Sequence, residues 1–128
     1  MTNISHSFNS DLKNYADAQE FCETMAMNRF TTGRLFEPMT SSFFEEVKTE
    51  SHRVFGKLRY RAPWIGIRRK GGYWVYRSSE TKVKFQIWKR DLPTPKKNKK
   101  RDCVSFGFTG KWNNSSCQAK TYFICEFA

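Results

Sequence analysis

The chain has 128 residues, which is enough for one domain with a substantial hydrophobic core, and no stretch approaches the roughly 20 apolar residues that span a membrane. It carries 23 Lys and Arg against 12 Asp and Glu, a formal net charge of +11, and aromatic residues make up 16% of it. The amino terminus has no basic start and no apolar run, so we expect either that a signal peptide was removed or that the protein is not secreted.

The positive charge is concentrated in one part of the chain. Residues 68–101 contain 13 Lys or Arg but only two acidic residues, Glu80 and Asp91, whereas the rest of the chain contains ten basic and ten acidic residues. The sequence therefore predicts a neutral scaffold that carries one strongly basic region.

The first third of the chain predicts a short strand near Phe8 and an amphipathic helix. Asn14 is a plausible N-cap with Asp17 three residues later. Residues at i, i+3, i+4 and i+7 form one apolar face, made of Ala18, Phe21, Cys22 and Met25. This places Cys22 on the inward side of the helix.

A second helix is expected after Pro38. Ser42 and Glu45 have the spacing of a capping box, and the apolar side is supplied by Phe43, Phe44 and Val47. We expect this helix to fade by Ser51.

The middle of the chain predicts a hairpin followed by a long loop. Residues Trp64–Ile67 and Tyr73–Tyr76 have the composition of strands, and Lys70–Gly72 is a turn between them. Residues 77–102 contain many lysines and few aliphatic side chains, and loops of this length in compact domains are usually functional or disordered. We expect this loop to be fastened to the core by Phe85 and Trp88.

The last quarter predicts three further strand segments. An alternating run contains Val104, Phe106 and Phe108, and Gly110 interrupts it. A short segment begins at Trp112, and Tyr122–Phe127 is a closing strand.

Four cysteines permit three pairings. There is no Cys-x-x-Cys pair and both histidines are distant in sequence, so we expect two disulfides in an oxidising compartment rather than a zinc site. Neighbouring cysteines in the last quarter suggest a small local ring, and Cys22 requires a distant partner.

The order of these features resembles the C-type lectin-like domain. The likeness covers nearly the whole chain and rests on Cys22, Trp64-Ile-Gly-Ile67, Trp88, Asp102-Cys-Val104, Gly110-Lys-Trp112-Asn113, Cys117 and Ile124-Cys-Glu126. The resemblance implies a single α+β domain over residues 1–128, in which two helices flank two small, mostly antiparallel sheets with a long loop region. It also implies the disulfides Cys22–Cys125 and Cys103–Cys117.

The resemblance further implies calcium-dependent sugar binding, but this chain departs from the pattern. Sugar-binding members carry Glu-Pro-Asn or Gln-Pro-Asp in the long loop, where this chain has Leu92-Pro93-Thr94. A further family carboxylate falls where this chain has the basic run 96–101, and the final Trp-Asn-Asp is here Trp112-Asn113-Asn114. Calcium takes six to eight oxygen ligands, several of them anionic. We therefore expect no metal site and no cofactor.

The basic residues of the loops are the candidate binding surface. We expect an anionic ligand, an acidic or sulfated glycan, to meet Arg68, Arg69, Lys70, Lys89, Arg90, Lys96, Lys97, Lys99, Lys100 and Arg101. The alternative without a binding role is a solvated loop that only adds solubility. The run 96–101 also resembles a nuclear-localisation or nucleic-acid-binding tract, but the cysteine framework argues against a nuclear protein, so no nucleic-acid partner is expected.

Two rival functions stay open, both for a secreted protein without catalytic activity. The domain could bind a protein surface, including a second copy as a homodimer, or it could bind a neutral sugar through an altered site. No nucleophile elbow or phosphate loop occurs, and Glu45 and Glu46 are adjacent on a helix and so point in different directions. The sequence therefore indicates a binding protein rather than an enzyme.

Overall fold

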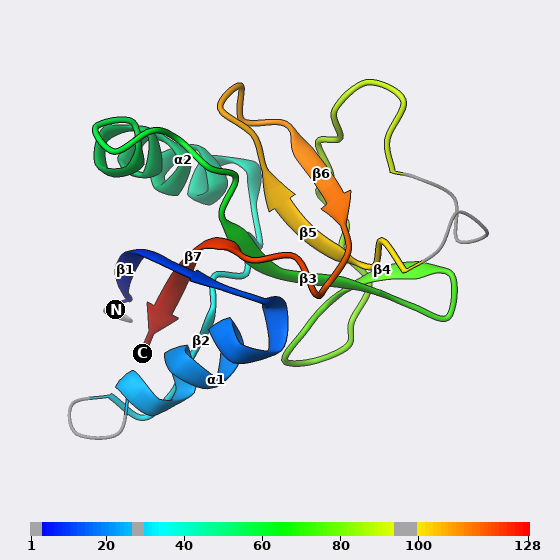
Figure 1. Ribbon diagram of the computed structural model, residues 1–128. Coiled ribbons are helices and arrows are strands. Elements are labelled where there is room, and N and C mark those ends of the chain that lie inside the picture. The colour runs from blue at the N-terminus through cyan, green and yellow to red at the C-terminus, as the bar shows by residue number, and fades with distance from the viewer. Residues whose placement is uncertain (1–3, 27–29, 94–99) are drawn as a thin grey trace.

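The computed structural model describes residues 4–26, 30–93 and 100–128 (Figure 1). Its elements are β1 (Ser5–Lys13), α1 (Tyr15–Met25), β2 (Gly33–Leu35), α2 (Ser41–Phe55), β3 (Trp64–Lys70), β4 (Tyr73–Tyr76), β5 (Cys103–Phe106), β6 (Trp112–Ser115) and β7 (Thr121–Phe127). In these parts of the chain, neither helix has the length and apolar character needed to cross a membrane.

Within the described residues, the strands form one seven-stranded sheet with the order β1-β7-β3-β5-β6, in which β2 also pairs with β7 and β4 with β3. All pairings are antiparallel except that of β3 with β7, which meet through the single pair Trp64 and Phe123. The two small sheets implied by the resemblance are therefore halves of one sheet: β1, β2 and β7 on one side of this junction, and β3 to β6 on the other.

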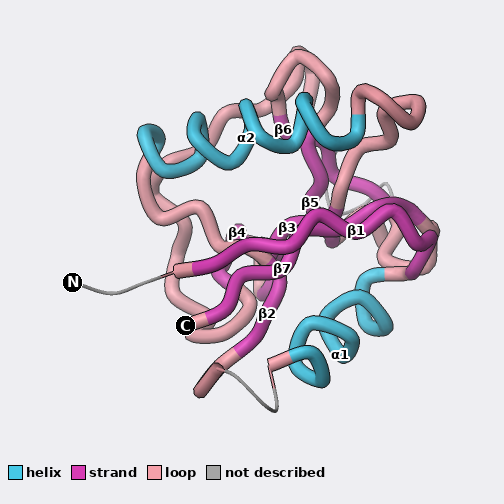
Figure 2. Tube along the Cα trace, turned by 90° about the vertical axis from the view of Figure 1, so that its left-hand side faces the viewer, coloured by secondary structure: helices cyan, strands magenta, loops and turns pink. Residues whose placement is uncertain are grey.

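The helices cover opposite sides of the strands (Figure 2). Beneath α2 lies the larger core, whose fully buried aromatic side chains include Phe44, Phe55, Phe106 and Trp112. Between α1 and the strands lies a second core that includes Leu35, Trp64 and Phe123. Stacking a helix on each side in this way buries the apolar stripe of each helix.

Helix α1 begins as predicted and buries Ala18 and Cys22 as expected, but its inward face differs from the prediction at Met25. The Asn14 side chain accepts a hydrogen bond from the Asp17 amide at 2.9 Å, which confirms the N-cap. Met25, expected in the core, is 44% exposed, and Gln19 is buried instead. Burial of Gln19 is tolerated because its Oε1 accepts a hydrogen bond from the Leu35 amide at 3.0 Å.

Helix α2 differs from the prediction at both ends. Its N-cap is Thr40, whose side chain accepts from the Phe43 amide, rather than Ser42. It continues past Ser51 to Phe55, because Ser51 is itself fully buried and extends the inward stripe. A small polar residue at an inward position hid this last turn from the sequence pattern.

Both implied disulfides are confirmed. Cys22–Cys125 joins α1 to β7, and Cys103–Cys117 joins the start of β5 to the segment after β6. The predicted hairpin turn is also confirmed: Gly71 and Gly72 have φ values of +59° and +88°, which favour glycine.

Strand β5 ends earlier than the alternation predicted. All four of its residues are buried, and the chain turns after Phe106, where the Gly107 amide donates to the Lys111 carbonyl at 2.9 Å. Phe108 therefore lies in the turn and is 60% exposed rather than packed in the core.

Candidate functional site

The first part of the long loop is fastened to the core by aromatic rings, as predicted. The Trp88 ring centroid lies 4.8 Å from that of Trp74 and 5.6 Å from that of Trp112, and Phe85 packs against Trp112 at 5.4 Å. The Trp112 amide donates to the Ile87 carbonyl and the Lys89 amide donates to the Trp112 carbonyl. Residues 87–89 thus run beside the free edge of β6.

The chain then turns at Lys89–Leu92. The Leu92 amide donates to the Lys89 carbonyl at 3.0 Å, and Asp91 has a positive φ of 67°. Both Lys89 and Arg90 are exposed. The anchored segment 87–89 before the turn fixes where these two cationic side chains begin.

A shallow groove of about 470 Å³ lies between this turn and the β5–β6 hairpin, and we call it the basic groove. Ser105 and Asn113 are direct partners across β5 and β6, and Ser115 lies two residues further on the same face. The lining residues are Ala62, Lys89, Arg90, Leu92, Arg101, Ser105, Asn113, Asn114 and Ser115. Of these described lining residues, three are cationic and none is a carboxylate.

The cations of the basic groove carry no internal counter-charge in the described parts of the chain. Within residues 4–26, 30–93 and 100–128, no carboxylate lies within 4.0 Å of the charged atoms of Lys89, Arg90 or Arg101. We call these three residues the groove cluster. Lys100 is exposed beside Arg101, whereas the predicted site residues Lys96, Lys97 and Lys99 lie outside the described residues.

The other predicted basic group, Arg68, Arg69 and Lys70, is the hairpin cluster, at the end of β3. Arg68 lies 3.8 Å from the Glu80 carboxylate, and Lys70 forms an ion pair with the same carboxylate. The single Glu80 therefore offsets part of the charge of two predicted ligand-binding residues.

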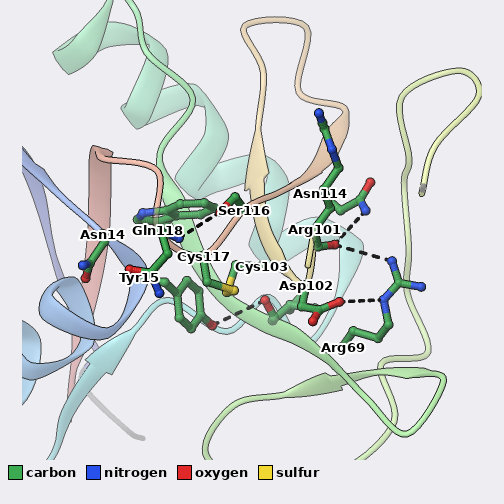
Figure 3. Close-up of a disulfide and its surroundings, with 12 residues drawn as sticks. Asn14, Tyr15, Arg69, Arg101, Asp102, Cys103, Asn114, Ser116, Cys117 and Gln118 are labelled. Atoms are coloured by element: carbon green, nitrogen blue, oxygen red, sulfur yellow. Dashed lines mark hydrogen bonds and ion pairs between the residues drawn. A yellow bond between two sulfur atoms is a disulfide. The ribbon is translucent and has the colours of Figure 1, made fainter. Parts of the chain in front are cut away.

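Arg69 is engaged more fully, and its side chain is only 10% exposed. Its Nε lies 3.1 Å from Oδ1 of Asp102 (Figure 3). Its guanidinium lies 4.6 Å from the Trp74 ring centre. The structure thus gives Arg69 internal contacts at the base of the long loop, where its charge meets a carboxylate and an aromatic face.

Among the described residues, two positions correspond to family calcium ligands, Leu92 and Asn114, and neither supplies a carboxylate. Leu92 has no side-chain oxygen, and Asn114 is 2% exposed with its Nδ2 donating to the Arg101 carbonyl at 2.8 Å. Among the described residues, no group of three or more His, Cys, Asp or Glu could hold a metal ion. This donor set, beside three cations, lacks the anionic oxygens that calcium requires.

Sequence reasoning missed the polar floor of the groove and the roles of Asn114 and Asp102. The floor could have been found, because Trp112 and Asn114 are buried while Asn113 and Ser115 are half-buried, which is the two-residue period of a strand. The partnership of Arg69 and Asp102 has no local signal, since 33 positions separate them in the chain.

The buried acidic residues belong to the scaffold and not to the groove. Glu126 accepts hydrogen bonds from the Glu37 amide at 2.6 Å and from the Arg34 guanidinium at 3.1 and 3.2 Å. Burial raises the pKa of Glu126, and the Glu37 amide and Arg34 counteract that rise. Glu37 in turn accepts from the amide and hydroxyl of Ser78. This network ties β2 and β7 to the segment after β4.

Comparison with known proteins places this geometry in a family. The profile of the Lectin C-type domain matches residues 11–127. Human lithostathine-1-beta is 28% identical over 133 residues, which cover 94% of this chain and 69% of that protein. Collectin-10 of Gallus gallus is 41% identical over 58 residues, which cover 45% of this chain and 21% of that protein. Collectin-10 of Mus musculus is 26% identical over 117 residues. The chain spans only 21% and 38% of the length of these two collectins.

Solved structures agree on the architecture. Human lithostathine superposes with a TM-score of 0.82 at 25% identity, covering 99% of this chain and 85% of that one. The C-type lectin CEL-I from Cucumaria echinata superposes with a TM-score of 0.81 at 19% identity, which shows the shared fold alone, and covers 100% of this chain and 92% of that one. With the profile match over nearly its whole length, the chain belongs to the C-type lectin domain family.

Proposed function

We propose that this chain is a secreted, calcium-independent lectin-like protein that binds an anionic ligand, a sulfated or acidic glycan, in the basic groove. The observation that carries the proposal is the lining of that groove, whose described residues include three cations and no carboxylate. Cations without internal partners interact most strongly with an external anion, because no ion pair has to be broken first. The hairpin cluster is left out of the proposed site, since its charges are engaged with Glu80 and Asp102.

The floor of the groove supports a glycan rather than a simple ion. Ser105, Asn113 and Ser115 supply hydroxyl and amide groups that both donate and accept hydrogen bonds. Sugar hydroxyls need partners of this kind, while sulfate or carboxylate groups need the cations at the rim. Membership of a family of binding domains agrees with recognition rather than catalysis.

Two disulfides support a secreted protein, because such bonds persist in oxidising compartments. The proposed independence of calcium rests on Leu92, which has no side-chain oxygen, and on Asn114, a neutral amide whose Nδ2 donates to the Arg101 carbonyl where the family pattern has a carboxylate. Two snake relatives are named as mannose-binding and galactose-binding C-type lectins. A neutral sugar therefore serves as the comparison ligand in the test.

The test is binding to immobilised heparin, with mannan as the neutral comparison, at several salt concentrations. In the variant Lys89→Gln/Arg90→Gln/Arg101→Gln, we expect heparin affinity to fall about 30-fold, from three exposed contacts of about 0.7 kcal/mol each. The dependence of log affinity on log salt should flatten by about two units, by analogy with nucleic acids. Calcium or a chelator should change neither result.

The matched control removes three charges from the scaffold, in the variant Lys13→Gln/Lys57→Gln/Lys120→Gln, and should weaken heparin binding less than about threefold. Equal losses in the two variants would mean that only net charge matters and that the groove is not a site. Calcium-dependent binding to mannan that exceeds heparin binding would support the neutral-sugar function instead.

One observation favours a second candidate, recognition of a protein surface. Phe108 is 60% exposed, yet its ring is held against His52 at 4.7 Å in a stacked arrangement and against Tyr60 at 5.2 Å. Rigid exposed aromatic rings are frequent anchors of protein interfaces. If the anchor binds a second copy, sedimentation should reveal a concentration-dependent dimer that Phe108→Ala abolishes, and a monomer at all concentrations would exclude the homodimer.

A further inference from the structure

The end of the long loop is held by contacts from two strands at once. The chain re-enters the sheet through Arg101 and Asp102, immediately before Cys103 of β5. We infer that Arg69 and Asn114 are positioning residues that clamp this return segment, so that Arg101 is set in the basic groove by protein contacts instead of by a metal ion. The inference rests on the proposed function for its ligand but not for its structural test. We call Arg69, Asp102, Asn114 and the Arg101 carbonyl the return clamp.

Strand β3 supplies one side of the return clamp. The Arg69 amide donates to the Asp102 carbonyl at 2.8 Å, and the Arg69 Nε forms the ion pair with the Asp102 carboxylate at 3.1 Å. Trp74, the direct partner of Arg69 in β4, lies against the same guanidinium. Arg69 is thus held by its backbone amide, by the ion pair with Asp102 and by the ring of Trp74. A solvated surface arginine would have none of these contacts.

Strand β6 supplies the other side. Asn114, buried opposite Val104 of β5, donates from Nδ2 to the Arg101 carbonyl at 2.8 Å, and Arg69 Nη2 lies 3.5 Å from the same oxygen (Figure 3). The Cys103–Cys117 disulfide lies next to these contacts and fixes the start of β5. The Arg101 carbonyl is therefore contacted by side chains of both β3 and β6, while Arg101 itself remains exposed at the groove.

Asn114 occupies the position where the family resemblance placed a calcium-binding carboxylate. An aspartate there could accept but not donate, so the hydrogen bond to the Arg101 carbonyl would be replaced by two facing oxygens. The side-chain amide of Asn114 therefore makes a hydrogen bond to the Arg101 carbonyl that a carboxylate at this position could not make. The clamp accounts for an ordered loop end in a chain whose donor set does not suit calcium.

The binding test separates a positioning residue from a contact residue by its salt dependence. Arg101→Gln removes an ionic contact, so affinity for heparin should fall and the log–log salt slope should flatten by somewhat less than one unit. Arg69→Gln should weaken affinity about fivefold with an unchanged slope, because its charge never meets the ligand. The matched control Arg68→Gln removes the same charge one residue away and should change affinity less than about twofold.

Two outcomes of this test overturn the inference. A slope change in Arg69→Gln equal to that in Arg101→Gln would make Arg69 a direct contact. Unchanged affinity in Arg69→Gln would mean that the clamp does not position the groove.

The structural test needs no ligand. Hydrogen exchange at the amide of residue 69, which is bonded to the Asp102 carbonyl, should be at least about ten times faster in Arg69→Gln than in Arg68→Gln. Asn114→Asp should likewise accelerate exchange at residues 101–103, and added calcium should not reverse it. Slower exchange of the unmodified protein in calcium would overturn the clamp, because a metal would then order the loop end. Failure of heparin binding alone would contradict only the proposed function.

Discussion

The groove cluster and the hairpin cluster each contain three basic residues, yet the structure treats them differently. Arg68 and Lys70 share the Glu80 carboxylate, and Arg69 is largely buried against Asp102 and Trp74. The groove cluster has no such partners among the described residues. A positive charge in the sequence therefore shows only that a cation is present, whereas its availability to a ligand depends on which carboxylates the fold brings beside it.

Removal of the Cys103–Cys117 disulfide is expected to have the largest effect of the changes that test this difference between the clusters. The variant Cys103→Ser/Cys117→Ser opens a ring with a sequence separation of 14 residues, and the free energy of unfolding should fall by about 3 kcal/mol. Urea unfolding measures this loss. Heparin binding should weaken in the same variant, since Arg101 precedes Cys103, while the Glu80 pairs are expected to persist. If the folded variant bound heparin as well as the unmodified protein does, the basic groove would not depend on the Cys103–Cys117 disulfide.

Removing two charges from each cluster compares them directly. Lys89→Gln/Arg90→Gln should lower heparin affinity about tenfold, which corresponds to about 0.7 kcal/mol for each contact. Arg68→Gln/Lys70→Gln should lower it less than about twofold, because those charges are already paired. Isothermal titration at constant salt gives both values. A larger loss from the hairpin variant would reverse the assignment of the site.

Removing the carboxylate that pairs with the hairpin cluster should reduce the difference in heparin binding between the two clusters. Glu80→Gln frees Arg68 and Lys70 from their shared carboxylate, so heparin affinity should rise about two- to threefold. The isosteric amide preserves the shape of the side chain. Asp11→Gln, a change of an exposed acid in β1, is the control for the added net charge. The same gain in both variants would attribute the effect to net charge instead of to local pairing.

A change of pH should alter the stability of the scaffold through its buried titratable groups. Burial lowers the pKa of His6, against an opposing effect of Glu46, and burial together with Lys48 lowers the pKa of His52. The unfolded chain therefore takes up protons near pH 6.5, before the folded chain does, and stability falls as the pH drops through the lowered pKa values. Glu126 acts in the opposite sense, because its raised pKa favours the folded state at low pH and that contribution disappears as the pH rises.

Thermal unfolding of His6→Gln between pH 7 and pH 5 measures the histidine contribution, which is the smallest effect expected here. The melting temperature of the variant should depend less on pH than that of the unmodified protein. Heparin affinity should stay constant over the same range while the protein is folded, because no histidine is among the described residues that line the basic groove. A steep rise in affinity on acidification would implicate a histidine in binding.

Features encoded by neighbouring residues were predictable from the sequence. The Asn14 cap, the Gly71–Gly72 turn and the aromatic anchors of the long loop each depend on contacts or conformations that a short stretch dictates. The family resemblance supplied the disulfide pairing, which the structure confirms. Local propensity and cysteine chemistry therefore determined most of the elements and the covalent frame.

Tertiary packing decided the rest. Gln19 is buried in α1 because its side chain accepts a hydrogen bond from the Leu35 amide, whereas Met25, predicted to be in the core, is exposed. Phe108 was excluded from the core because the chain turned before reaching it. Arg69 was assigned to the scaffold by a carboxylate 33 residues away. The sequence by itself determined how much positive charge the loops carry, and the fold determined which of those charges have partners, because pairing depends on distances in space that the order of residues does not contain.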